Sequence, residues 1–499
     1  DAFVCLLQLV AMEAGLLQKG DASDKRGCPR LCVFCKRRRL VICMVVVLAI
    51  AGAIGAFVKF YHPLQPVNVN FGGWLLLEYW MFQGPENYWR GVCLPPAVIS
   101  QPWPSEGILV QQMLISQGRN KTIDNFRRFR EAFISAQDLD DAKSVGVQVI
   151  RVPFLWSAFA DALATMDPNI YGGYDPETES IVVPDPYYRK DVSYVTIPRN
   201  LLSQLLKNCS VRGLKVVLDL HAHPSGSAEG AYNGISPMPP VFWLKHVRIG
   251  NTTIALTEVG LLLVEKFISW VEGLDEAALA AVRGISLMNE PGNAIKVDHK
   301  IIFGWLTTAA QLFRTSRLPG RGIKLYVNVI QLPMDNFFAV TSKWWGNTFS
   351  MWERYRWAVF DMHNYIAWNP WCRGHQADVN ESGWTCNQSL EDARKEIGGC
   401  LGSFLQGVAY YFNGLRASGE FSLATDYVDE YACQSRDVLS MFLDEQRKVF
   451  SYYGFEPFFW TWKMPYSPVK EPVWSYSHFK GVARPPAFQC HPPQASTQT

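Results

Sequence analysis

The chain has 499 residues, of which 48% are apolar and 18% are charged, so it can bury one large hydrophobic core or two ordinary ones. This composition excludes a disordered scaffold. The 47 basic and 45 acidic residues leave a formal net charge of +2, and four of the basic residues stand together at 36–39. No basic field for nucleic acid remains, and we expect no nucleic-acid partner.

An uncharged apolar run is the first predicted element. Residues 40–58 read LVICMVVVLAIAGAIGAFV, and as a helix they would extend about 28 Å, enough to cross a bilayer. KRRR precedes this run and a single Lys59 follows it, so the positive-inside rule places 1–39 in the cytosol and the rest of the chain outside it. A signal peptide is the alternative, but its apolar segment is usually shorter and nearer the N-terminus. We therefore expect one uncleaved transmembrane helix.

Glycosylation sequons and cysteines fit the same compartment. Five of the twelve cysteines lie before or within the apolar run and seven lie beyond it, so at least one of the seven has no intrachain partner. The cluster of Cys28, Cys32 and Cys35 has no fourth ligand nearby, which favours palmitoylation over zinc binding. Asn-x-Ser/Thr sequons begin at five positions beyond the run, namely Asn120, Asn208, Asn251, Asn380 and Asn387.

From residue 61 to residue 490, short β-rich apolar runs alternate with helix-like segments, the pattern of parallel strands joined by crossover helices. We expect a long loop at 166–199, which is rich in Pro, Tyr and Asp, and a short C-terminal tail at 491–499. Eight runs are expected to be strands, the number that closes a (β/α)8 TIM barrel. They are 67–78, 147–154, 214–221, 282–290, 323–330, 357–365, 416–421 and 456–463. The predicted fold class is therefore α/β, a TIM barrel behind a single transmembrane helix.

Polar residues end most of these runs, where a barrel of this kind builds its active site. Two glutamates, Glu290 and Glu420, matter most, because acetal hydrolysis uses one carboxylic acid to protonate the leaving oxygen and a second carboxylate to stabilise or attack the cation. Taken alone, Glu290 is better explained as a rim glutamate paired with an arginine, and Glu420 alone is ambiguous. The full set of candidates is Glu78, Arg151, His221, Asn289, Glu290, His363, Tyr365, Glu420 and Trp460.

Three of the motifs leave alternatives open. His363 and Tyr365 are two apart on a strand and so share a face, although a buried histidine is more often structural than catalytic. Arg151 would keep Glu420 ionised or form a structural ion pair. His221 and His223 have the same spacing and would suit a metal site completed by a carboxylate. Hydrolysis by two glutamates needs no metal, so we predict neither a metal nor another cofactor.

Taken in chain order, these motifs resemble glycoside hydrolase family 5, and more closely its exo-β-1,3-glucanase branch. The resemblance covers about Val67–Cys490, nearly the whole outer domain. The motifs that carry it are GGWLLLE (72–78), RVP (151–153), DLHAHPSGS (219–227), LMNEP (287–291), HNY (363–365), GEF (419–421) and WTWK (460–463).

The resemblance implies a role for each candidate. Glu290 matches the acid/base and Glu420 the nucleophile, while Asn289 matches the residue that binds the sugar 2-hydroxyl. Arg151 and Tyr365 match the groups that orient the nucleophile. The subsite for the non-reducing-end glucose would be lined by Glu78, His221, His363 and Trp460, and Trp368 resembles an aromatic residue at the pocket entrance.

Several positions depart from the family pattern. The second entrance aromatic falls near Ala231 and Tyr232, and Ala222 replaces a family glycine, which would narrow the pocket. The resemblance implies a disulfide between Cys400 and Cys490. The family partner of Cys433 falls near Tyr427, so we expect that bridge to be absent, and we expect Cys372 and Cys386 to close a loop of their own.

Together these features predict a single-pass type II membrane protein whose catalytic domain lies outside the cytosol. It would be a retaining glycosidase that releases glucose from the non-reducing end of β-1,3-glucans, with a β-glucan and the bilayer as its partners. An endo-acting β-glucanase or a glucan transferase is an alternative, because both use the same two glutamates. From another class, a non-catalytic surface protein that binds glucan is the remaining alternative.

Overall fold

The computed structural model describes residues 64–82, 103–329, 336–376, 383–465 and 471–483. All of them belong to the unit Leu64–Thr499, which internal contacts separate from Asp1–Pro63. The predicted transmembrane segment at 40–58, the cytosolic segment before it, Cys490 and the predicted tail at 491–499 lie outside the described residues. Within the described ranges, no helix is both long enough and apolar enough to cross a bilayer.

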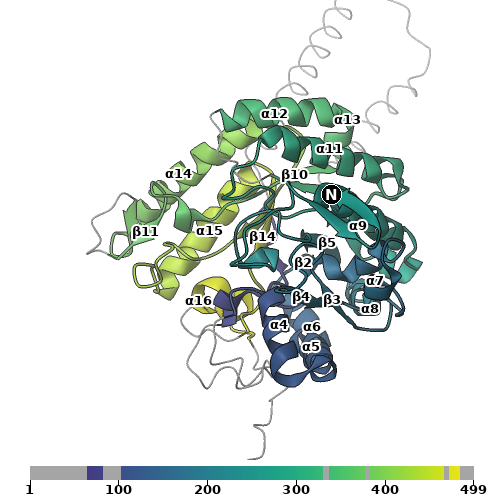
Figure 1. The fold of residues 1–499 in the computed structure, drawn as a ribbon. Coiled ribbons are helices and arrows are strands. Elements are labelled where there is room, and N and C mark those ends of the chain that lie inside the picture. The colour runs from purple at the N-terminus through teal and green to yellow at the C-terminus, as the bar shows by residue number, and fades with distance from the viewer. Residues whose placement is uncertain (1–63, 83–102, 330–335, 377–382, 466–470, 484–499) are drawn as a thin grey trace, which may run out of the picture. The chain divides into compact units, whose positions relative to one another are not determined.

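Eight parallel strands form a closed barrel at the centre of Figure 1, in the order β1-β14-β13-β10-β9-β8-β5-β2. Each barrel strand pairs with the one before it and the one after it along the chain, as a (β/α)8 barrel requires. Every one of the eight predicted runs overlaps one barrel strand, so the predicted TIM barrel is confirmed. The strands are β1 (Asn68–Asn70), β2 (Val149–Leu155), β5 (Lys215–Ala222), β8 (Val282–Ser286), β9 (Lys324–Asn328), β10 (Ala358–His363), β13 (Leu415–Phe421) and β14 (Phe455–Phe459).

The barrel strands are apolar because they are covered on both faces. One set of side chains fills the barrel interior, with Val149, Val217, Tyr326, Val359, Ala417 and Phe458 forming a separate buried cluster. The other set packs outward against the helices in the main core. A charged side chain in such a strand must therefore pair with a group of opposite charge or point into the mouth of the barrel.

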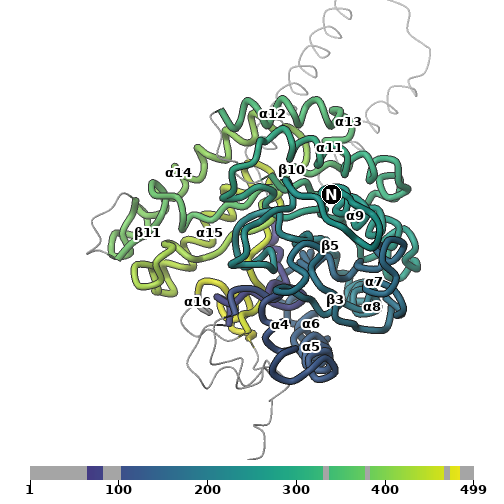
Figure 2. The backbone as a smooth tube through the Cα atoms, in the orientation of Figure 1, coloured from purple at the N-terminus to yellow at the C-terminus, as the bar shows by residue number. Residues whose placement is uncertain are grey.

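Helices surround the barrel, as Figure 2 shows. The connection from β5 to β8 illustrates why they form: α9 buries Val259, Leu263, Phe267 and Val271, spaced four residues apart on one face. The longer helices are α4 (Glu106–Gln117), α5 (Arg119–Phe133), α6 (Ala136–Ser144), α8 (Arg199–Ser210), α9 (Leu256–Glu272), α11 (His299–Thr315), α12 (Phe337–Thr348), α14 (Leu390–Tyr411) and α15 (Arg436–Tyr452). The short ones are α7 (Pro168–Tyr171), α10 (Glu276–Leu279), α13 (Met351–Arg356), α16 (Glu471–Trp474) and α17 (Tyr476–Phe479).

Two expectations about the barrel mouth need correction. The segment 166–199 is not one loop, because it contains α7 and an antiparallel hairpin of β3 (Val182–Pro184) and β4 (Ser193–Val195). Asp185 next to this hairpin accepts hydrogen bonds from the backbone and side chain of Ser225, at 2.7 Å each, and so ties the hairpin to the loop after β5. The first strand ends at Asn70, so Glu78 lies beyond it, just before the turn of 3-10 helix η1 (Tyr79–Phe82).

Both cysteine pairs predicted from the sequence are wrong, and Cys433 has a partner that the sequence did not suggest. Cys372 bonds to Cys400 and Cys386 bonds to Cys433, with Cα–Cα distances of 5.6 and 5.5 Å. Cys400 is therefore not available to Cys490, and Cys372 and Cys386 do not close a loop together. Cys433 does not use the family position near Tyr427 and bonds to Cys386 instead. Both bonds join the segment after β10 to parts of the chain that only the fold brings near, namely α14 and the loop after β13. Among the described residues, Cys209 is a buried free thiol.

Candidate active site

A buried arginine on β2 organises the bottom of the site. The Nη1 of Arg151 donates to Glu420 Oε1 at 2.7 Å and to Asn70 Oδ1 at 3.0 Å. Its Nη2 donates to Asn289 Oδ1 at 2.7 Å and lies 2.9 Å from Asp219 Oδ2. Burial opposes the charge, but the carboxylates of Asp219 and Glu420 outweigh it and raise the pKa of Arg151. The guanidinium is therefore a permanent cation that fixes the position of Glu420.

The second oxygen of Glu420 has a donor of its own. The hydroxyl of Tyr365, which follows β10, donates to Glu420 Oε2 at 2.7 Å. Burial, together with the charge of Glu420, raises the pKa of Tyr365 well above its ordinary value, so the hydroxyl keeps its proton and remains a donor. Glu420 is thus a buried carboxylate with one fixed donor on each oxygen.

Glu290 lies just after β8 and has a different set of contacts. Its backbone adopts a φ of 42°, and its N–H donates to Asn328 Oδ1 at 2.8 Å. The Nδ1 of His363 is 2.6 Å from Glu290 Oε1 and 3.4 Å from Glu420 Oε2. Burial would raise the pKa of Glu290, but the hydrogen bond and charge of His363 outweigh it and lower that pKa. In turn the carboxylates raise the pKa of His363 against the effect of burial. His363 and Glu290 therefore share one proton tightly.

Two residues beyond the predicted catalytic set contact Glu290: Asn293, which the sequence did not single out, and Tyr232, which was expected only near the pocket entrance. The side-chain amide of Asn293 donates to Glu290 Oε2 at 3.0 Å and to the hydroxyl oxygen of Tyr232 at 2.9 Å. The segment around Ala231 and Tyr232, expected at the pocket entrance, thus brings Tyr232 to the acid/base candidate. Neither residue ends a barrel strand, so the strand-end argument did not include them. The spacing of Asn293, three residues after Glu290 in NEPGN, was the available signal.

The two glutamates lie close together. One oxygen of each and a ring nitrogen of His363 all lie within 4.8 Å of one another, a spacing that could also hold a metal ion. However, Arg151 and Tyr365 already donate to Glu420, and a guanidinium 2.7 Å away would repel a second cation. The arrangement therefore suits carboxylate chemistry better than metal binding.

The two histidines of the β5 motif turn to separate partners. The Nδ1 of His221 is 2.6 Å from Asp219 Oδ2, whereas the Nε2 of His223 is 2.8 Å from the carbonyl oxygen of Leu287. Burial lowers the pKa of His223 to about 4, so it is neutral and structural. The alternative of a metal site built from His221 and His223 is not supported by this geometry. Ala222, between them, is buried and is not among the described residues that line the cavity.

A cavity of about 840 Å³ opens above these side chains. At one end the ring of His221 stacks on Trp460, with ring centroids 6.0 Å apart and an interplanar angle of 27°. Nearby, the indole N–H of Trp80 donates to Glu78 Oε2 at 2.9 Å. Burial, helped by the charges of Glu420 and Glu290, raises the pKa of Glu78 to about 8, so Glu78 carries a proton at neutral pH. This end of the cavity presents both aromatic faces and hydrogen-bonding groups.

The structure brings together all ten residues that the sequence singled out. Trp368 stands at the cavity edge with 57% of its surface exposed, and its ring meets Tyr365 edge-on at 5.1 Å. Arg151 lies beneath the cavity and reaches it through Glu420. The other nine line the cavity: Glu78, His221, Asn289, Glu290, His363, Tyr365, Trp368, Glu420 and Trp460.

Comparisons with known proteins agree with this picture. No protein-family profile matches the chain. A glucan 1,3-beta-glucosidase of Blumeria graminis is 25% identical over 45% of this chain and 41% of its own length. A probable glucan 1,3-beta-glucosidase D of Neosartorya fischeri is 24% identical over 86% of this chain and 49% of its own length. The chain therefore spans about half the length of the curated relatives it matches.

The fold comparison finds a solved structure of similar fold. The crystal structure of rutinosidase from Aspergillus niger superposes with a TM-score of 0.55 at 14% identity, covering 84% of this chain and 97% of that one. At this identity the likeness concerns the fold alone. The predicted resemblance to the exo-β-1,3-glucanase branch of glycoside hydrolase family 5 is confirmed by the relatives named glucan 1,3-beta-glucosidase.

Proposed function

We propose that this chain is a family 5 glycoside hydrolase that releases glucose from the non-reducing end of β-1,3-glucans with retention of configuration. The observation that carries the proposal is the pair of buried glutamates in unlike surroundings, with oxygens less than 4.8 Å apart. Retaining enzymes hold their two carboxyl groups about 5–5.5 Å apart, whereas inverting enzymes need about 6.5–9.5 Å to fit a water molecule. The close approach of one oxygen from each glutamate is compatible with the retaining arrangement.

Glu420 is the nucleophile in this mechanism. Donors on both of its oxygens hold the carboxylate in place, so little reorganisation is needed when it attacks the anomeric carbon. The attack forms a glycosyl ester, and the bond to the leaving oxygen breaks. Asn289, held by Arg151, is positioned to bind the 2-hydroxyl of the same sugar.

Glu290 and His363 supply the proton. In the free site the two share one proton across a 2.6 Å contact, and Glu290 passes it to the leaving oxygen. Forming the ester removes the negative charge of Glu420 from beside His363, which lowers the affinity of the His363–Glu290 pair for a proton. Glu290 therefore stays deprotonated after it has protonated the leaving oxygen. In this form it acts as the base that activates water, and hydrolysis of the ester restores Glu420.

Exo action is supported by the part of the cavity lining that includes Trp460. Glu78, Trp80, His221 and Trp460 all line the cavity, and together they offer one glucose aromatic faces and hydrogen bonds. The names of the curated relatives supply the β-1,3 linkage. Product analysis on laminarin tests this part: glucose as the first product supports exo action, whereas oligosaccharides indicate an endo-acting enzyme or a transferase.

The mechanism is tested by covalent trapping. A 2-deoxy-2-fluoro glucosyl inhibitor slows both steps and should leave a stable ester on Glu420, detectable as a mass increase of one peptide. An adduct on another residue would refute the assignment of the nucleophile. Laminarin binding with neither adduct nor released sugar would favour the non-catalytic alternative.

We also propose that a single helix at 40–58 anchors the protein as a type II membrane protein, with the domain at 61–490 outside the cytosol. Three of the sequons, Asn120, Asn251 and Asn387, are exposed, and the two disulfides fit an oxidising compartment. Expression of the full chain with microsomes tests the topology. A glycosidase-sensitive mass shift and protection from added protease support it, and an unglycosylated, protease-sensitive chain contradicts it.

A further inference from the structure

The cavity does not end at the catalytic side chains. It continues past Trp368 over three segments outside the barrel: the segment after β10, the loop after β13, and one face of α14. The residues that line this extension are Asn369, Pro370, Cys372, Leu401, Phe404, Asp426, Tyr427 and Asp429. In Figures 1 and 2, α14 and α15 run side by side, and β11 (Gly374–His375) lies near one end of them.

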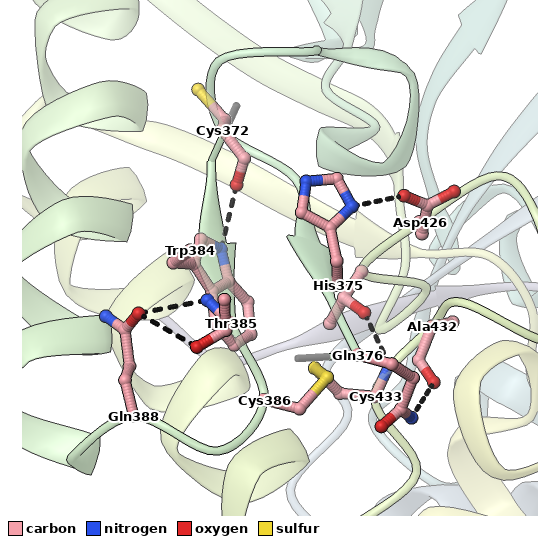
Figure 3. Close-up of a disulfide and its surroundings, with 11 residues drawn as sticks. Cys372, His375, Gln376, Trp384, Thr385, Cys386, Gln388, Asp426, Ala432 and Cys433 are labelled. Atoms are coloured by element: carbon pink, nitrogen blue, oxygen red, sulfur yellow. Dashed lines mark hydrogen bonds and ion pairs between the residues drawn. A yellow bond between two sulfur atoms is a disulfide. The ribbon is translucent and has the colours of Figure 1, made fainter. Parts of the chain in front are cut away.

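Covalent and buried polar contacts hold this extension in place. The segment after β10 is tied to α14 by the disulfide Cys372–Cys400 and to the loop after β13 by Cys386–Cys433. Figure 3 shows the surroundings of the second bond, where a buried histidine ring, that of His375, contacts Asp426 Oδ2 at 2.9 Å. These contacts make the outer segments a fixed surface and not a free loop.

Two exposed aromatic side chains lie on these segments, and one of them, Tyr427, lines the cavity. Trp371, between the lining residues Pro370 and Cys372, is 75% exposed, and Tyr427 is 53% exposed. The guanidinium of Arg373 lies over the ring of Tyr427, 5.0 Å from its centroid, and holds one face of it. Single exposed aromatics are ordinary, but here they adjoin the catalytic cavity on a surface fixed by two disulfides. We call Trp371 and Tyr427 the outer platform.

We propose that the outer platform binds glucosyl residues on the leaving-group side of a β-glucan chain. The inference rests on the proposed function, because the glucose to be released fills the end of the cavity around Glu78 and Trp460. The remainder of the chain must then leave past Trp368, where the cavity continues to the platform. Flat aromatic faces pack well on the apolar faces of pyranose rings. The protein would therefore favour oligosaccharides long enough to reach Trp371 and Tyr427 over disaccharides.

The test compares a long substrate with a short one. In the full chain, Trp371→Ala and Tyr427→Ala should each lower the ratio of kcat/KM for laminarihexaose to that for laminaribiose by about three- to tenfold, the effect of one lost aromatic contact. Trp371→Phe should restore most of the ratio. The matched control is Trp352→Ala on α13, which is 60% exposed and, unlike Trp371, has no cavity-lining residue on either side of it in the chain, and it should leave the ratio unchanged.

A binding measurement separates this inference from the proposed function. Calorimetric titration of Glu420→Gln with both oligosaccharides needs no turnover, and the longer one should bind more tightly only while the platform is intact. If the wild-type protein cleaves no glucan, the proposed hydrolysis is wrong. The titration still shows whether the platform binds the longer oligosaccharide. Equal affinity for the two oligosaccharides would overturn the proposed role of the platform. So would an equal loss of kcat/KM on both oligosaccharides in the Trp371 and Tyr427 variants.

Discussion

The two halves of the cavity are fixed by different means. Around Glu420 the side chains are buried and held by charge-assisted hydrogen bonds of 2.6–2.7 Å from strand ends. On the outer platform Trp371 and Tyr427 remain exposed, and disulfides fix the backbone that carries them. Bond making needs each atom in a defined place, whereas packing on a sugar ring tolerates small shifts. Changes in the first half should therefore affect every substrate, and changes in the second should affect long substrates only.

The largest effect is expected for Glu290→Ala. General acid catalysis contributes about 10²–10⁴-fold, so the rate on substrates with poor leaving groups should fall by that factor. The aryloxide of an activated aryl glucoside leaves without needing a proton, so the rate on these substrates should fall far less. Kinetics on a matched series of glucosides checks this. Equal losses across the series would remove Glu290 from the acid/base role.

A second large effect is expected for Arg151→Lys. A lysine keeps the positive charge but cannot reproduce all the bonds of the guanidinium to Glu420, Asn289 and Asp219, so at least one buried polar group loses its hydrogen bond. The free energy of unfolding should fall by about 1–3 kcal/mol, and activity per folded molecule should fall on all substrates. Denaturant unfolding and active-site titration measure the two quantities.

Arg130→Lys is the matched control for this prediction. Arg130 is also buried, and its Nη2 lies 3.3 Å from Glu106 Oε1 in a pair outside the cavity. This variant should lose stability but keep its activity per folded molecule. An equal loss of specific activity in both variants would mean that Arg151 acts only through stability.

A smaller effect concerns pH. Burial raises the pKa of Glu78 from 4.5 to about 8, so between these values the folded protein keeps a proton that the unfolded chain releases. The stability contributed by this group therefore falls as pH rises from about 4.5 to about 8 and is constant above that. Glu78→Gln has no such proton, so its melting temperature should rise relative to wild type as pH increases through this window. Its KM should increase on short and long substrates alike, and parallel melting curves at all pH values would contradict the assignment.

The barrel could be predicted from the sequence because its physical signal is local. Parallel strands covered on both faces are continuous apolar runs, and polar residues such as Glu420 and Tyr365 at their ends interrupt that pattern. For the same reason the site residues on strand ends could be predicted together. The order of the motifs along the chain then separated Glu290 and Glu420 from ordinary rim carboxylates.

What could not be predicted depends on contacts between distant segments. Tyr232 and Asn293 come from two turns that meet only at Glu290, so no periodic pattern marks them. The cysteine pairs were wrong because spacing along the chain does not reveal which segments pack together. Cys400 lies on α14, which the fold brings beside the segment after β10. The outer half of the cavity, built from such contacts, was therefore absent from the prediction.

The smallest effect should separate the two halves most cleanly. Cys400→Ser breaks the bond between α14 and the segment that carries Trp371, although Cys400 itself does not line the cavity. Losing a disulfide of this kind costs about 2–4 kcal/mol of stability, and the loss should be confined to the outer segments because the barrel core is untouched. The preference for laminarihexaose over laminaribiose should then fall a few-fold, whereas hydrolysis of an aryl glucoside should persist. Cys209→Ala removes a buried cysteine without breaking a bond and is the matched control. If Cys400→Ser slows both substrates equally, the disulfide supports the catalytic half as well, and the two halves of the cavity are not independent.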